Sequence, residues 1–131
     1  MTSVPSQLEY TAAHEWIRRL PDGVVEMGIT DHAQHALGDL VFVELPEIGR
    51  VLEAGEACAV VESVKSASDV YAPVSGEVIA RNTALEQTPE TINQDPYHAG
   101  WMLRVRLAPG AAAAAVLSAA EYQTLLDTEG G

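Results

Sequence analysis

The sequence predicts a mainly β fold, a flattened β-barrel or sandwich with short peripheral helices and a further helix at its C-terminal end. Short apolar stretches rich in β-branched residues recur along the chain, and Gly, Pro, Asn or Asp separates them every ten residues or so. At 131 residues the chain is long enough to bury a core without disulfides. The 47% hydrophobic and 5% aromatic content fits a core of Val, Leu, Ile and Ala. We expect a single domain over residues 1–131, with its core at about 8–107 and an Ala-rich segment and helix at 108–131.

The apolar pattern places a series of strands in this domain. Polar residues 1–7 are expected to be a loose lead-in. A turn at residues 20–23 combines Pro21, which presets one φ, with Gly23, which accepts a positive φ. The expected strands are 8–10, 14–18, 24–29, 40–45, a short one between Gly49 and Gly55, 56–64, 76–81 and 101–107.

Three helices are expected around these strands. Thr30 is expected to cap a helix over 31–37 that ends at Gly38. Thr88-Pro89 predicts a helical turn with proline as its first helical residue. Residues 118–121 fit a capping box, which begins a helix that runs to about residue 127, and residues 128–131 are expected to fray.

Residues 60–73 predict a hairpin around which the rest of the chain is organised. Val60, Val61 and Val64 favour a strand, and the small residues 66–69 are expected to reverse the chain, so that Lys65 lies at the tip with its amine in water. Lys65 is the only lysine in the chain. A bias of the genome towards arginine explains the other cations. Because an amine can lose its proton and be acylated whereas a guanidinium stays protonated, a single retained lysine also fits a position where the amine must react.

The charge and the cysteine count exclude several classes of function. A net charge of −12 argues against binding to nucleic acid and to anionic membrane surfaces. No apolar run approaches the length of a membrane span, and neither a signal nor a transit peptide is visible. The single cysteine, Cys58, excludes an internal disulfide and fits a reducing compartment, so we expect the cytoplasm.

No pattern in the chain predicts an independent enzyme. The sequence lacks a Ser-His-Asp order, a glycine-rich phosphate loop and paired cysteines. His14, His32 and His35 are candidates for a metal cluster, and two of them, three residues apart on a short helix, can face one way. No third ligand has motif spacing, however, so the sequence predicts no metal site.

Five blocks of residues resemble those of the glycine cleavage system H proteins, in the same order. They cover about residues 8–107. The blocks are Tyr10-Thr11 with His14-Glu15-Trp16, residues 28–34 with 37–39, residues 41–46, residues 62–70 with 73–78, and residues 93–97 with Gly100-Trp101.

This resemblance implies a lipoyl-type domain that carries lipoate in amide linkage on Lys65. It implies a carrier, not an enzyme, which moves an aminomethyl unit from glycine decarboxylase (P protein) to the aminomethyltransferase (T protein) and its dihydrolipoyl arm to dihydrolipoamide dehydrogenase (L protein). Lipoate-attaching enzymes would be further partners. The candidates for recognition of partners or for an arm-binding groove are Glu62, Ser66, Ser68, Asp69 and Glu15.

Other interpretations stay open from the sequence. One is a lipoyl relay protein, and another is a lipoyl or biotin carrier domain of a different complex. Methionines usually flank a biotin site, whereas Lys65 lies between Val64 and Ser66. A third interpretation is an unmodified β-sandwich that serves as an interaction module.

Overall fold

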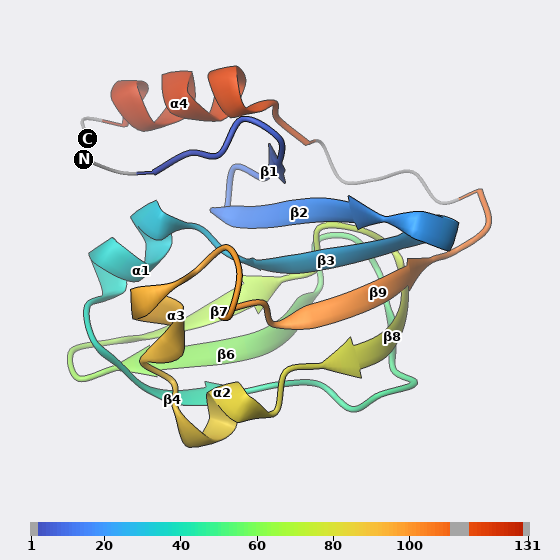
Figure 1. Cartoon of the computed structure of the whole chain (residues 1–131), viewed down its shortest axis with the longest axis horizontal. Helices are drawn as coiled ribbons and strands as arrows, with labels where there is room; N and C mark the ends of the chain where they lie inside the picture. Colours follow the sequence, from blue (N-terminus) through green and yellow to red (C-terminus); the bar gives the residue numbers. More distant parts are fainter. Residues whose placement is uncertain (1–2, 111–115, 130–131) are drawn as a thin grey trace.

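Two antiparallel sheets form the body of the protein in the computed structural model, which describes residues 3–110 and 116–129 (Figure 1). The larger sheet has the order β1-β2-β3-β9-β8-β5, and the smaller has the order β4-β6-β7. The strands of the larger sheet are β1 (Glu9–Tyr10), β2 (Glu15–Leu20), β3 (Val24–Ile29), β9 (Leu103–Leu107), β8 (Gly76–Arg81) and β5 (Val51–Leu52). Those of the smaller sheet are β4 (Leu40–Glu44), β6 (Ala57–Ser63) and β7 (Ala67–Tyr71). The predicted fold class is confirmed.

The main core lies between the two sheets. Ile17, Val25 and Met27 of the larger sheet are buried in one cluster with Val61 and Val70 of the smaller sheet. Because side chains alternate between the faces of a strand, each of these strands sends every second residue into the core. Apolar burial across the two inner faces therefore stabilises the sandwich.

A second, aromatic core lies on the outer side of β1 and β2, under helix α4 (Ala119–Thr128) (Figure 1). The rings of Tyr10 and Tyr122 stack there with centroids 4.6 Å apart. Trp16 is fully buried and lies across from Gly28 of β3. A Cβ at Gly28 would lie 2.8 Å from Trp16 Nε1, so glycine is required for the indole to pack on this face.

Local capping signals predicted two helices correctly. Helix α1 (Asp31–Leu37) begins where the Thr30 hydroxyl accepts a hydrogen bond from Ala33 N, and it ends at Gly38, whose φ is +85°. Helix α4 begins with the predicted capping box, in which Ser118 and Glu121 bond each other's backbone N–H.

The helical turn predicted to start at Thr88-Pro89 is present, since Thr91 N and Ile92 N donate to the carbonyls of Thr88 and Pro89. Two short helices occupy this region, α2 (Ala84–Gln87) and α3 (Thr91–Gln94). The Thr88 hydroxyl donates to the carbonyl of Ala84 and closes α2, and Pro89 has no N–H with which to continue the helix. Pro89 therefore follows the end of α2 and lies in the turn that leads into α3, whose regular part begins two residues later.

The turn predicted at residues 20–23 forms a short 3-10 helix, η1 (Pro21–Gly23), with positive φ at Asp22 and Gly23. No helix in the described parts of the chain is long and apolar enough to cross a membrane.

The described part of the N-terminal segment is held in place, which corrects the expectation of a loose lead-in. Ser3 N donates to Asp31 Oδ2 at 2.8 Å, and the Tyr97 hydroxyl donates to the carbonyl of Ser3 at 2.6 Å. The Tyr10 hydroxyl donates to the carbonyl of Pro5. Parts of three predicted segments lie outside the described residues. They are residues 1–2 of the lead-in, 111–115 of the Ala-rich segment and 130–131 of the expected frayed end.

Candidate functional site

The β6–β7 hairpin presents Lys65 at its tip, as predicted, but the chain reverses earlier than expected. The turn spans residues 63–66, closed by a bond from Ser63 N to the carbonyl of Ser66 at 2.7 Å. The Ser63 hydroxyl accepts from the backbone N–H groups of Lys65 and Ser66 at 3.3 and 3.1 Å. Residues 67–69, expected in the turn, belong instead to β7. The reason is the side chain of Ser63, which bonds the backbone of the turn and lets it be completed within four residues.

The Lys65 side chain is exposed, and its stem lies over the end of α1. A Cβ at Gly38 would lie 3.5 Å from Lys65 Cε, which is an ordinary van der Waals distance, so the lysine stem packs beside the residue that ends α1. Val64 beside it is 78% exposed, so the hairpin tip stands clear of the sandwich. Within residues 3–110 and 116–129, no carboxylate forms an ion pair with the Lys65 amine.

The other candidates on the hairpin separate onto its two faces. Glu62 pairs across the strands with Ala67, and Asp69 pairs with Val60, so both acidic residues point to the outer face of the smaller sheet. Asp69 is exposed and Glu62 is half-buried. Ser68 pairs with the buried Val61 and therefore lies on the inner face. Ser66 is exposed in the turn beside the lysine.

A groove lies beside the hairpin, between β7, helix α1 and the loop that joins β1 to β2. It is lined by Ala13, His14, His32, Ala33, Ala36, Leu37 and Ser68. Small and apolar side chains make up most of this lining. Among the candidates for partner recognition or for an arm-binding groove, Ser68 is the one that lines it. Glu62 and Asp69 lie on the opposite face of the sheet.

Glu15 does not line this groove but lies behind it. Its side chain is 2% exposed and accepts hydrogen bonds from the Thr11 hydroxyl and from Tyr71 N at the end of β7. Burial raises the pKa of the Glu15 carboxyl, and the two hydrogen bonds oppose that shift in part. The neighbouring Cys58 is buried in the main core, and burial raises the pKa of its thiol to about 12.

The structure brings together two of the three histidines that were metal candidates. The rings of His14 and His32 have centroids 4.7 Å apart, whereas His35 lies on the exposed side of α1. Burial and the neighbouring His32 lower the pKa of His14. Sequence reasoning missed the third member, Glu129, whose Oε1 lies 3.4 Å from His14 Nε2. No local spacing signal points to Glu129, because it lies 115 residues beyond His14 and comes close only through the docking of α4.

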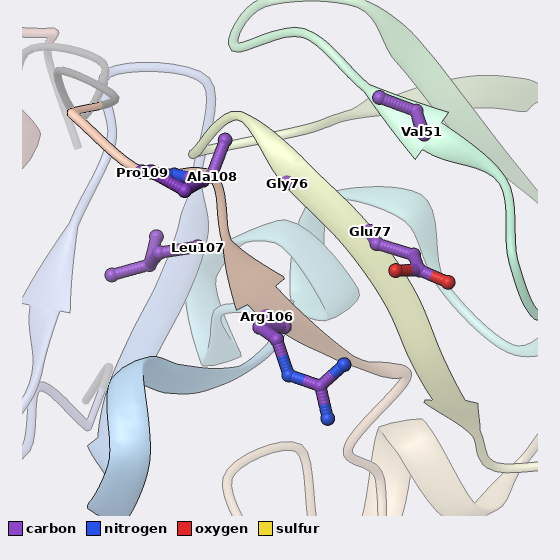
Figure 2. Close-up of a pocket in the computed structure, with 7 residues that line it drawn as sticks. All are labelled: Val51, Gly76, Glu77, Arg106, Leu107, Ala108 and Pro109. Atoms are coloured by element: carbon purple, nitrogen blue, oxygen red, sulfur yellow. The ribbon is translucent and has the colours of Figure 1, made fainter.

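A second hollow lies where β5, β8 and β9 meet, away from all the candidates (Figure 2). Its floor is Gly76, where a Cβ would lie 2.1 Å from the carbonyl oxygen of Arg106. The close approach of these two strands therefore requires glycine. Of the side chains drawn in Figure 2, only Glu77 and Arg106 are charged, and they extend away from the apolar wall that Leu107 and Pro109 provide.

Comparison with known proteins gives concordant matches. A profile of the family described as glycine cleavage H-protein matches residues 8–129. The glycine cleavage system H protein of Enterobacter sp. is 52% identical over 129 residues, which cover 98% of this chain and 100% of the relative. That of Azoarcus sp. is 56% identical over 124 residues, covering 95% and 97%. The crystal structure of a glycine cleavage system H protein from Mycobacterium marinum superposes with a TM-score of 0.88 at 46% identity, covering 95% and 99%.

Proposed function

The chain belongs to the glycine cleavage H-protein family, and we propose that it acts as the lipoyl carrier of that system through a lipoyl group in amide linkage on Nζ of Lys65. The single observation that carries this proposal is the placement of the only lysine at the tip of an exposed antiparallel hairpin. There, an attaching enzyme can reach the amine, and the loaded arm can afterwards reach the active sites of several partner enzymes.

The residues around Lys65 suit covalent attachment. The Ser63 hydroxyl holds the backbone of the turn, so the direction of the side chain is set before a partner binds. No neighbouring carboxylate among the described residues pairs with the amine, so no ion pair has to be broken when an attaching enzyme approaches it. Acylation removes the positive charge of the lysine. When attached, the lipoyl group supplies a disulfide at the end of a long, neutral arm, which can take up and release the aminomethyl unit.

The groove beside the hairpin is the proposed resting place of the arm. Its small and apolar lining suits the methylene chain of the arm, and Ser68 provides a polar contact. Glu15, expected near this groove, is proposed to act from behind it by fixing the Thr11 loop and the end of β7. If Glu15 protects the loaded arm, Glu15→Ala should accept lipoate normally and lose the aminomethyl unit to water faster than the wild type. Equal rates of loss would make Glu15 a structural residue only.

The proposed partners are glycine decarboxylase, the aminomethyltransferase, dihydrolipoamide dehydrogenase and the lipoate-attaching enzymes, and the proposed setting is the cytoplasm. Glu62 and Asp69 are the proposed recognition residues, because both face outwards beside the attachment point. Asp69→Asn should slow lipoate attachment at low salt, where charge complementarity speeds encounter. Glu44→Gln is a matched control, since Glu44 is exposed and lies on strand β4, outside the hairpin that carries the lysine.

The test is an intact mass with peptide mapping after incubation with lipoate, ATP and a lipoate ligase. The wild type should gain one lipoyl group on Lys65, and Lys65→Arg should gain none while keeping the same circular dichroism spectrum. With the three partner enzymes added, Lys65→Arg should support no glycine cleavage. A folded wild type that gains no lipoyl group, or a Lys65→Arg variant with partial activity, would refute the covalent-arm mechanism. Modification by a biotin ligase would then point to a biotin carrier, and the absence of either modification to an unmodified module.

A further inference from the structure

Two histidines and a glutamate from three separate parts of the chain meet at one end of the sandwich. His14 lies in the loop before β2, His32 in the first turn of α1, and Glu129 directly after α4. Candidate ligand atoms of the three side chains all lie within 4.8 Å of one another. Figure 1 shows the start of β2, the helix α1 and the end of α4 on the same side of the molecule. We propose that His14, His32 and Glu129 bind one zinc ion, which clamps the end of α4 onto α1 and the loop before β2.

The spacing of the His14–Glu129 pair fits a shared metal ion. His14 Nε2 and Glu129 Oε1 are 3.4 Å apart. An N–H···O hydrogen bond joins atoms about 2.7–3.2 Å apart. Two ligand atoms each about 2.0–2.1 Å from a tetrahedral zinc ion lie about 3.4 Å from one another. The candidate ligand atom of the half-buried His32 lies within 4.8 Å of the other two.

A chain of hydrogen bonds behind His14 fixes the ring for this role. His14 Nδ1 lies 2.7 Å from the Tyr122 hydroxyl, which lies 2.8 Å from the Thr30 hydroxyl. The Thr30 oxygen accepts from Ala33 N. With the proton on Nδ1, His14 donates to Tyr122, Tyr122 donates to Thr30, and the Nε2 lone pair faces Glu129. Metal-binding histidines are commonly oriented in this way by a partner of the second ring nitrogen.

The ligand set selects the class of ion. Two imidazole nitrogens and one carboxylate suit zinc, whereas calcium and magnesium take oxygen ligands. Three protein ligands leave a fourth position for water, on the side where His14 and His32 line the groove. The net charge of −12 raises the local concentration of cations around the protein.

The experiment titrates untagged, unlipoylated protein with zinc. Isothermal titration calorimetry measures the binding, and thermal unfolding measures the change in stability. The wild type should bind one equivalent and unfold at a higher temperature with zinc than without it. His32→Ala and Glu129→Gln should each weaken zinc binding by about tenfold or more. His35→Ala is the matched control on the same helix, and it should bind as the wild type does. His14 is left intact because its φ of +71° and its bond to Tyr122 tie it to the fold.

Two outcomes would overturn the proposal. The first is a folded wild type that binds no zinc, or binds zinc and calcium equally, as scattered surface carboxylates would. The second is unchanged zinc binding in both His32→Ala and Glu129→Gln. Because lipoate is not involved in any of these measurements, failure of the zinc site leaves the proposal for Lys65 untouched.

Discussion

Asn93 in α3 joins three segments with one side chain, and its removal is the most informative test of how the end of the sandwich near Lys65 is held. Its Nδ2 donates to Gln34 Oε1 at 2.9 Å and to the carbonyl of Gly38 at 3.0 Å. Its Oδ1 accepts from Leu40 N at 2.9 Å. The bonds tie α3 to the last turn of α1 and to the first residue of β4.

The expected loss of stability in Asn93→Ala follows from these three bonds. Each contributes about 1 kcal/mol net, which gives about 3 kcal/mol in total. Leu40 is 3% exposed, so its N–H has little access to water once the partner is gone. For a chain of this size, we expect the melting temperature to fall by about 10 °C.

Chemical denaturation of both proteins measures the difference in the free energy of unfolding. Gln94→Ala is the control, because Gln94 is the exposed neighbour on the same short helix, and it should change stability by less than about 0.5 kcal/mol. Asn93→Asp should also destabilise at neutral pH, since a carboxylate oxygen would replace the donor that faces two acceptors. A loss below about 1 kcal/mol in Asn93→Ala would refute the reasoning and indicate that water replaces these bonds at little cost.

Three further predictions concern the two cores and helix α4. Gly28→Ala should destabilise the protein by about 1–3 kcal/mol, because its Cβ would lie 2.8 Å from Trp16 Nε1. The tryptophan fluorescence spectrum should shift as well. An unchanged unfolding midpoint and an unchanged fluorescence spectrum would contradict the packing argument. Ser118→Ala removes one half of the capping box and should cost about 1 kcal/mol by thermal unfolding, whereas Ser118→Asp should keep most of the stability. The pKa of Cys58 is raised from 9.0 to about 12, so the unfolded thiol loses its proton before the native one does. The free energy of unfolding should therefore fall as the pH rises above 9, and it should fall less in Cys58→Ala. If it falls equally with pH in the wild type and the variant, the loss does not come from the Cys58 thiol.

Much of the fold was predictable from signals that lie close together in the sequence. Helix α1 has the predicted bounds because its cap at Thr30 and its end at Gly38 are local. Strands β3 and β8 also have the predicted bounds, since apolar β-branched runs and flanking turn residues define them. Lys65 at a hairpin tip followed from the same reasoning.

The errors arose where one residue type fits two roles. Pro89 suits the first turn of a helix, as predicted, and it also follows the end of α2, a short helix that the sequence analysis did not predict. Ser66 to Asp69 suit a turn, but pairing with β6 draws residues 67–69 into a strand once Ser63 has closed the turn. The polar N-terminal segment was expected to be loose, and Tyr97, 94 residues away from Ser3, holds it.

The sequence by itself determined the strand pattern, the main helices and the place of the single lysine at a hairpin tip, because caps, turns and β propensity act over a few residues. Only the tertiary structure decided that Ser68 faces the groove, that Glu15 lies behind it, and that His14, His32 and Glu129 meet. The face of Ser68 depends on the β6–β7 register, since a shift of one residue reverses every side chain. The histidine–glutamate cluster depends on α4 packing over β1, where the stacked rings of Tyr10 and Tyr122 bring residue 129 to residue 14.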